Sequence, residues 1–485
     1  MDSCRVEKDA LGNINVPLTA YYGSFTTRAK LNFVISDLTP SDYFRKSLAI
    51  IKKSALYTNF DLGLIDQKFF DVIDKAINEF LEGKFNAEFN LDYFQAGAGT
   101  PFNMNFNEII ANRANELLGS KLGKYEYVHP NNHVNMGQSS NDVIPTAIRI
   151  SAIMYFNDEL LPSIKNLIDV LIAKSSEGID VIKVGRTHLE DAVPMTVQDE
   201  FLAFARNIEK SLKFLSSSVE TLFELGLGGT ALGSGITSHS KYRDNVIEYL
   251  RQFSGLSEIY ISDNLFEMSQ SCQALGIYSA GLRCLANDLV KISQDLKLLN
   301  MGPNSGLSEI TLPEVEPGSS IMPGKVNPSV AEAMHMIAVQ VIGNDTAVQY
   351  GVNSGQLQLN VMTPMILFNL EFSSKILKNG IDMFVNFCVK DIIFNKDRIT
   401  ELVDKSLIYA TSLVPYLGYQ VVAELVNEAL LSKSSITAVT LKYSLVSQEL
   451  LDKILSPKTL DVDVKLRNEI QNSESYLNYK HLIGK

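Results

Sequence analysis

Four polar, glycine-rich segments carry most of the side chains in this sequence that could do chemistry. They span residues 95–108, 129–142, 185–196 and 316–328, and they interrupt a chain with otherwise helical patterns. Threonine, serine, asparagine, histidine and lysine are abundant in them, and carboxylates are few. Hydroxyl, amide and backbone N–H groups can donate hydrogen bonds to an anion, and a lysine or histidine adds positive charge. The four segments therefore indicate a site for a small anionic ligand.

The fourth segment, EPGSSIMPGKVNP at residues 316–328, is the most specific of them. Its glycines and prolines restrict the path of the backbone, and its polar side chains are Ser319, Ser320, Lys325 and Asn327. A glycine-flanked loop before a long helix can close over a substrate and present backbone donors to an oxyanion. Taken alone, the pattern also fits a loop at the start of a helix with serine caps.

Neither a metal ion nor a cofactor is expected at these segments. A hard metal ion needs carboxylate-type oxygen ligands, which are scarce here. His129, His133 and His188 lack the spacing of zinc ligands. Gly97 and Gly99 resemble a fragment of a dinucleotide-binding loop, but no strand of a parallel βαβ pattern precedes them.

The composition excludes several other classes of protein. A net charge of -12 disfavours a non-specific nucleic-acid binder or a protein of anionic membrane surfaces. The charged start of the chain lacks the apolar run of a signal peptide, and no segment is apolar enough for a transmembrane helix. The four cysteines are far apart in the sequence, as expected for reduced thiols: Cys4, Cys272, Cys284 and Cys388. We therefore expect a cytoplasmic protein.

Long helices must position the four segments. Apolar residues recur three and four apart over residues 146–175, 197–225, 267–299, 328–350 and 364–388, with shorter amphipathic stretches at 48–60 and 69–81. Helices of this length joined by glycine-rich loops imply a helical bundle. The predicted fold is mainly α. It has an N-terminal domain (1–142), a long central bundle (143–394) and a smaller C-terminal helical domain (395–485) that ends in a polar tail.

The stretch at 328–350 is apolar nearly all round. A helix of this kind fits the centre of a bundle or a subunit interface better than a surface. We therefore expect the protein to oligomerise through its bundle.

The sequence GSSIMPGKVN at residues 318–327 resembles the signature of the aspartase/fumarase superfamily, GSS-x-x-P-x-K-x-N. The other three polar segments also match their counterparts in this family, in the same order, and the similarity runs from Arg5 to about Pro457. The resemblance implies a helical bundle flanked by smaller domains. It also implies a homotetramer in which loops of three subunits build each active site.

The resemblance further implies roles for individual residues. Ser319 would be the general base that removes a proton from the carbon beside a carboxylate. Lys325, Asn327 and backbone N–H groups would stabilise the resulting aci-carboxylate dianion. His188 would act as a donor to the substrate. The expected substrate-binding residues are Thr100, Ser139, Ser140, Asn141, Thr187 and Ser320. His129 and Asn131 correspond to a second anion site near the surface, and turn chemistry explains these two about as well.

The sequence carries marks of both aspartases and fumarases. AYYG at 20–23, GAGT at 97–100, GLSEI at 306–310, SGQ at 354–356 and the absence of tryptophan resemble aspartases, whereas SSND at 139–142 is the fumarase form. Pro101, Asn304 and Gln358 depart from both patterns. The resemblance therefore implies an aspartate ammonia-lyase first, and a fumarate hydratase as the alternative. A member with an altered substrate comes third, and a catalytically silent dicarboxylate-binding or structural homologue stands for a different class.

Overall fold

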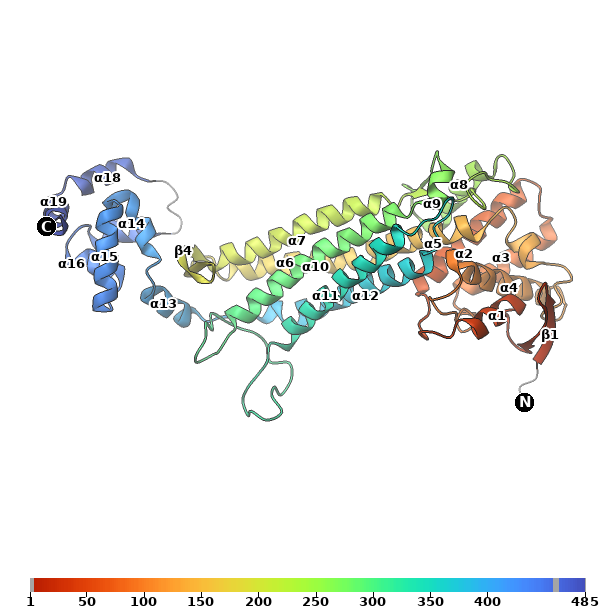
Figure 1. Ribbon diagram of the computed structural model, residues 1–485, viewed down its shortest axis with the longest axis horizontal. Helices are drawn as coiled ribbons and strands as arrows, with labels where there is room; N and C mark the ends of the chain where they lie inside the picture. The colour runs from red at the N-terminus through yellow and green to blue at the C-terminus, as the bar shows by residue number, and fades with distance from the viewer. Residues whose placement is uncertain (1–3, 457–461, 485) are drawn as a thin grey trace. The chain divides into compact units, whose positions relative to one another are not determined.

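In this computed structural model, which describes residues 4–456 and 462–484, packing divides the chain into two compact units. Unit 1 comprises Met1–Ile164, Lys210–Val290 and Met336–Gly380, and unit 2 comprises Lys165–Glu209, Lys291–His335 and Ile381–Lys485. Both are built mainly of helices, which confirms the predicted fold class (Figure 1). The division into successive domains at residues 142 and 394 stays a prediction, because each unit is assembled from separate stretches of the chain.

Unit 1 begins with an antiparallel hairpin and continues as a helical layer. The hairpin is β1 (Cys4–Asp9) and β2 (Gly12–Pro17), and a short parallel pair is β5 (Glu224–Leu225) with β6 (Tyr260–Ile261). The helices are α1 (Ser24–Asn32), α2 (Asp42–Asp61), α3 (Gln67–Leu81), α4 (Thr100–Leu117), α5 (Ser140–Tyr155), α8 (Tyr242–Ser254) and α9 (Leu265–Gln270). Helix α2 packs against α3, α5 and α8. Its buried face includes Phe44, Leu48 and Ile51, at the three- and four-residue spacing of an amphipathic helix.

Five long helices contain the boundaries between the units. They are α6 (Leu161–Ser176), α7 (Val197–Glu220), α10 (Gln273–Leu299), α11 (Ser329–Val352) and α12 (Thr363–Phe387). Within unit 1, buried polar contacts join three of them. Ser279 on α10 donates to Asp345 on α11 over 2.6 Å, and Asn344 on α11 donates to Ser373 on α12 over 2.9 Å. Buried polar groups need such partners, so these pairs fix which helix faces meet.

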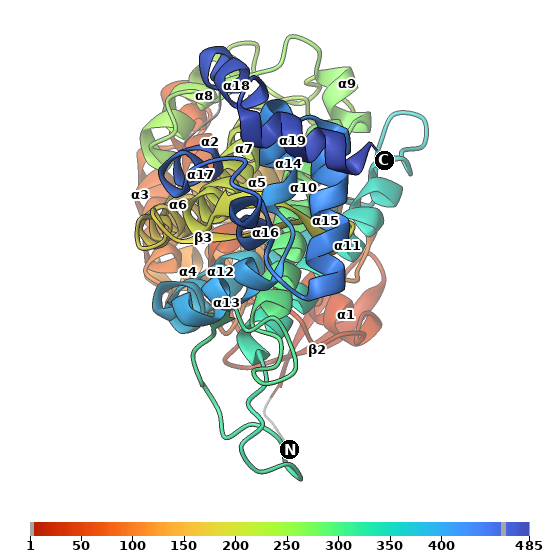
Figure 2. The ribbon, with the colours of Figure 1, turned by 90° about the vertical axis from the view of Figure 1, so that its left-hand side faces the viewer.

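Unit 2 contains two small antiparallel sheets and the C-terminal helices. The sheets pair β3 (Ile182–Thr187) with β4 (Glu190–Thr196), and β7 (Ile310–Thr311) with β8 (Ile393–Phe394). The helices are α13 (Lys396–Lys405), α14 (Tyr409–Leu417), α15 (Tyr419–Ser432), α16 (Ile436–Lys442), α17 (Gln448–Leu455), α18 (Val464–Gln471) and α19 (Glu474–Ile483). Helices α14 and α15 lie side by side at the centre of this last group, drawn in blue (Figure 2).

The described part of the predicted polar tail is folded. Helices α18 and α19 bury Leu466, Ile470, Tyr476 and Tyr479 against the C-terminal core. Leu466 and Ile470 are four residues apart, and Tyr476 and Tyr479 are three apart, so each pair lies on one face of its helix. The predicted polar tail is therefore helical over 462–484, while residues 457–461 and 485 lie outside the described residues. The bounds of the C-terminal domain stay a prediction.

Helix α5 begins six residues earlier than the apolar pattern predicted. Pro145, which directly precedes the apolar pattern, lies inside the helix. Ser139 caps the helix, and the Asp142 carboxylate accepts the Ser139 backbone N–H over 2.9 Å, which completes a capping box. The cap therefore offsets the hydrogen bond that proline cannot donate.

Helix α11 is not buried on all sides of this single chain. Ala338 and Val341 are buried, but Met336 and Val339 are 67% and 52% exposed.

The described part of the chain contains no helix that is long and apolar enough to cross a membrane. Burial of α11 in a subunit interface and a cytoplasmic location both stay predictions.

Candidate active site

Unit 1 contains a cavity of about 510 Å³ where helices α4 and α5 begin. Its lining includes three residues expected to bind substrate, Thr100, Ser139 and Ser140, and both residues of the expected second anion site, His129 and Asn131. The hydroxyl-bearing side chains of the first group are half-buried. The structure thus brings together residues from two segments that are forty positions apart in the sequence.

The glycine-rich turn before Thr100 makes this approach possible. Ala98 and Gly99 have left-handed backbone angles, with φ of 59° and 67°. A Cβ added at Gly99 would lie 2.9 Å from Cγ2 of Ile144, so only glycine lets the start of α4 pack this closely on α5. As a result, Oγ1 of Thr100 lies 2.9 Å from Oγ of Ser140.

The first turn of α5 forms a second side of the cavity. Oγ of Ser139 accepts the backbone N–H of Asn141 over 3.2 Å. The N-terminus of a helix presents backbone donors and a partial positive charge, and both favour a carboxylate. The Asn141 side chain donates to the carbonyl oxygen of Ala231 over 2.7 Å and is absent from the cavity lining.

Asp142 holds the loop that follows β5 against α5. Its Oδ2 atom accepts the backbone N–H groups of Gly228 and Thr230 over 3.0 and 2.9 Å. The carboxyl group is buried, and desolvation raises its pKa to about 6 in spite of these donors. The sequence interpretation missed this residue, although an acidic residue three positions after a serine is a capping-box signal.

Asp142→Ala is expected to lower the free energy of unfolding by at least about 2 kcal/mol, because two buried backbone N–H groups and one half-buried backbone N–H group lose their acceptor. Urea unfolding at a fixed protomer concentration measures the change. Asp244→Ala, which removes an exposed carboxylate from α8, is the control and should change it by less than about 1 kcal/mol. Equal stability of both variants would contradict a structural role for Asp142.

His129 takes part in a turn as well as in the cavity wall. The ring atom Nδ1 of His129 accepts the backbone N–H of Asn131 over 3.1 Å. The backbone N–H of His129 donates to Nδ1 of His133 over 2.8 Å. Burial lowers the pKa of both histidines, which favours the neutral ring. The turn chemistry is therefore present, and the second anion site stays a prediction.

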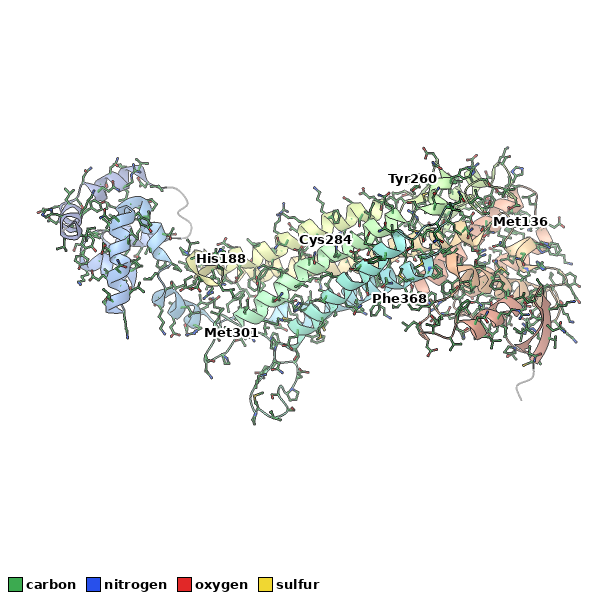
Figure 3. The ribbon with its side chains drawn as sticks, in the orientation of Figure 1. Met136, His188, Tyr260, Cys284, Met301 and Phe368 are labelled. Atoms are coloured by element: carbon green, nitrogen blue, oxygen red, sulfur yellow. The ribbon has the colours of Figure 1, made fainter. Side chains whose placement is uncertain are left out.

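Thr187 and His188 lie in unit 2, at the turn between β3 and β4 (Figure 3). His188 and Leu189 form a two-residue turn with φ of 57° and 64°. Asn-Gly is the usual sequence of such a turn, so the backbone conformation is unfavourable for His188 and Leu189. Both residues are exposed. Strain of this kind is common in functional loops.

A buried ion cluster supports this hairpin. Nζ of Lys183 lies 2.7 Å from Glu200 and 2.8 Å from Glu309, and Nη1 of Arg186 lies 2.7 Å from Glu309. Only 1% of the Glu309 side chain is exposed. Glu309 directly precedes β7, so the cluster ties the hairpin to the segment that leads into residues 316–328. The sequence interpretation did not single out this residue.

The segment 316–328 is a loop of unit 2 that is closed by its own contacts. The Ser319 N–H donates to the Lys325 carbonyl over 2.9 Å, and Nζ of Lys325 donates to Oδ1 of Asn327 over 2.6 Å. Gly318 has φ of 82°, and a Cβ there would collide with the same carbonyl oxygen. Ser320 lies in this loop and is exposed. The loop thus brings three of the predicted catalytic residues, Ser319, Lys325 and Asn327, together.

Known proteins resemble this chain over most of its length. Residues 12–343 match the family described as Lyase, and residues 410–460 match the family described as Fumarase C C-terminus. An aspartate ammonia-lyase of Bacillus subtilis is 42% identical over 453 residues, which cover 93% of this chain and 95% of that protein. A class II fumarate hydratase of Nitrosomonas europaea is 40% identical over 460 residues, which cover 95% and 99%.

Solved structures agree with these relatives. A class II fumarase from Schistosoma mansoni matches with a TM-score of 0.90 and 38% identity, covering 94% of this chain and 99% of that one. Because the family match spans more than half of the chain and the relatives match nearly all of it, this protein belongs to the aspartase/fumarase superfamily and is a lyase.

Proposed function

We propose that this protein eliminates ammonia from L-aspartate to give fumarate. The aspartase form of four segments, at residues 20–23, 97–100, 306–310 and 354–356, carries the proposal. Curated aspartate ammonia-lyases at 42% identity support it. The second of these segments forms the turn that brings Thr100 to Ser140. The third contains Glu309, which pairs with Arg186 next to Thr187 on β3.

In this proposal Ser319 is the general base. Its Oγ accepts the backbone N–H of Met322 over 3.2 Å and of Ile321 over 3.4 Å, and these donors lower the cost of an alkoxide. The alkoxide takes a proton from the carbon beside the β-carboxylate, which becomes an aci-carboxylate dianion. The C–N bond then breaks, ammonia leaves, and the new C=C bond gives fumarate. Lys325 and Asn327, already paired in the loop, stabilise the dianion.

The remaining residues hold the substrate. Thr100 and Ser140 offer two adjacent hydroxyl groups that can accept hydrogen bonds from the ammonium group. The hydroxyl group of Ser139 donates to a carboxylate, which the partial positive charge at the N-terminus of α5 also favours. The resemblance adds Asn141 to this set. Thr187 and His188 bind the other end of the substrate, and Ser320 belongs to the same set.

A homotetramer with shared active sites is part of the proposal. Apolar side chains next to two site segments are unusually exposed in the single chain: Leu189 is 76% and Ile321 83% exposed. Together with Met336 and Val339 on α11, they are the kind of surface that a protein partner covers. The partner proposed here is a further copy of this chain.

Fumarate hydratase is the second candidate. The SSND form at residues 139–142 favours it, and class II fumarate hydratases reach 40% identity. In that reaction water leaves L-malate instead of ammonia leaving L-aspartate.

The ultraviolet absorbance of fumarate tests the proposal, in parallel assays with L-aspartate and with L-malate. Formation from aspartate alone is the expected result. Formation from malate alone would replace the proposal by fumarate hydratase. Silence with both substrates would overturn both candidates and favour a different substrate or a silent homologue.

Lys325→Ala is expected to raise the activation free energy by about 2.7–4 kcal/mol, as removal of an oxyanion donor does. The loss should appear in kcat, because the dianion exists only after proton removal. Steady-state kinetics separate the two constants. A rise in KM with unchanged kcat would instead make Lys325 an anchor for the bound substrate.

A further inference from the structure

A buried lysine lies directly behind the wall of the unit 1 cavity. Lys52 on α2 is 1% exposed, and its Nζ donates to Oδ1 of Asn135 over 2.9 Å. The same oxygen accepts the amides of Asn103 and Asn107 over 3.0 and 3.1 Å. Asn103 and Asn135 line the cavity beside Thr100. One side chain therefore separates the ammonium group from the cavity.

These contacts connect the two helix starts that carry the hydroxyl groups. Asn103 and Asn107 belong to α4, which begins at Thr100. Asn135 opens the turn that leads to Ser139, and its Nδ2 donates to the Gln138 carbonyl over 3.1 Å. Lys52 therefore fixes the turn before α5 relative to α4.

The charges that face Lys52 leave its ammonium group incompletely balanced. On α5 the charged partner is Asp142, and on α8 the neutral Tyr242 lies near that carboxylate. Helix α4 contributes the amides of Asn103 and Asn107, which share the acceptor Asn135 with Lys52. It also carries Glu108, which lines the same cavity and whose pKa burial raises. On α3, Asp74 pairs with Lys53, 3.4 Å away. Burial lowers the pKa of Lys52 to about 7, because desolvation outweighs the attraction of Asp142.

We propose that Lys52 is a positioning residue that gives the anion subsite its positive charge and takes up a proton from solvent when a dicarboxylate binds. The inference rests on the proposed function, because the bound anion is the substrate carboxylate held at Ser139, in the same cavity as Asn103 and Asn135. An anion held against Asn103 and Asn135 favours the ammonium form of the amine behind them. By linkage, the ammonium form binds the anion more tightly by the same factor, about 5- to 10-fold.

The sign of the pH effect follows. Below pH 7 the lysine is charged before the anion arrives, so binding is tight and takes up no proton. Above pH 7 the neutral amine must bind a proton first, so the Kd of a dicarboxylate rises. The largest proton uptake is expected between about pH 7 and 8.5, where the free protein has lost the proton and the complex keeps it.

Succinate, a dicarboxylate without a leaving group, is the probe for this experiment. Calorimetry in buffers of different ionisation enthalpy measures protons taken up per site between pH 6 and 8.5. The wild type should take up a fraction of a proton above pH 7, and its Kd should rise about 5- to 10-fold over the range. Lys52→Met should lose most of this uptake and bind succinate more weakly. The uptake that remains belongs to Asp142, whose carboxyl group has a pKa of about 6 and loses the attraction of Lys52 in this variant.

Lys53→Met is the matched control. Lys53 is the next residue of α2, but its Nζ donates to Asn78 on α3 over 2.6 Å. Its variant should behave as the wild type. Lys52→Arg retains a permanent charge and should bind tightly at every pH without proton uptake, which keeps the test open if Lys52→Met does not fold.

Two results would overturn the inference. One is equal proton uptake by the wild type and Lys52→Met, and the other is a wild type that binds succinate with no uptake at all. If the wild type forms fumarate from aspartate but takes up no proton on binding succinate, the proposed function stands and the role of Lys52 is refuted. A wild type that neither binds succinate nor forms fumarate removes the proposed function and this inference with it.

Discussion

Ser319→Ala is expected to reduce kcat by about 10²- to 10⁴-fold, the contribution of a general base, while the fold and the oligomer persist. The side chain's hydrogen bonds in the structure are those that Oγ accepts from loop N–H groups, Ile321 and Met322. The backbone bond from Ser319 to the Lys325 carbonyl survives the substitution. The loop should therefore keep its shape and lose only the group that accepts the substrate proton.

Fumarate absorbance measures the rate, and size-exclusion chromatography measures the assembly. Ser217→Ala, which removes an exposed hydroxyl from α7, controls for the loss of a serine elsewhere and should retain full activity. A near-normal rate for Ser319→Ala would refute the assignment of the base. An inactive variant that no longer assembles would show that the residue acts through the structure.

The helices could be predicted because their apolar residues follow the helical period. The interpretation of 69–81 as a helix corresponds to α3 (Gln67–Leu81), and that of 328–350 corresponds to α11 (Ser329–Val352). The start of α5 could not be obtained from periodicity. Its first turn is fixed by the capping box of Ser139 and Asp142, which overrides the proline at position 145. The break between α9 and α10 at Ser271 was likewise absent from the apolar pattern.

The site was predictable as a set of segments but not as a geometry. Polar composition located the loops, and the resemblance supplied roles for their residues. The approach of Thr100 to Ser140 depends on the close packing of Gly99 on Ile144, which no spacing in the sequence reveals. Lys52 was also invisible, because a lysine in an amphipathic helix ordinarily marks the solvent face.

Buried charged residues could not be predicted from the sequence, and the structure is needed to identify them. Among them, substitution of Glu309 is expected to lower the free energy of unfolding the most. Its almost fully buried carboxylate accepts a hydrogen bond from Arg186 over 2.7 Å and forms an ion pair with Lys183, 2.8 Å away. Glu309→Ala leaves Lys183 with Glu200 and removes the nearest carboxylate of Arg186, which keeps the more distant Asp191 at 3.8 Å. Breaking a buried pair by removing one partner costs about 3–5 kcal/mol. Because the same cluster supports the hairpin of His188, activity should fall as well.

A double-mutant cycle separates the contribution of the Lys183–Glu309 ion pair to the free energy of unfolding from the cost of the cavity that each substitution creates. Lys183→Met and Glu309→Met are each expected to destabilise the protein in urea at a fixed protomer concentration. The double variant removes both members of the Lys183–Glu309 pair, while Arg186 keeps Asp191 at 3.8 Å. It should lose clearly less than the sum of the two single losses. Simple additivity would mean that the two side chains do not support each other. In that case the packing of β3 on α13, through Val184, Val403 and Ile408, would anchor the hairpin instead.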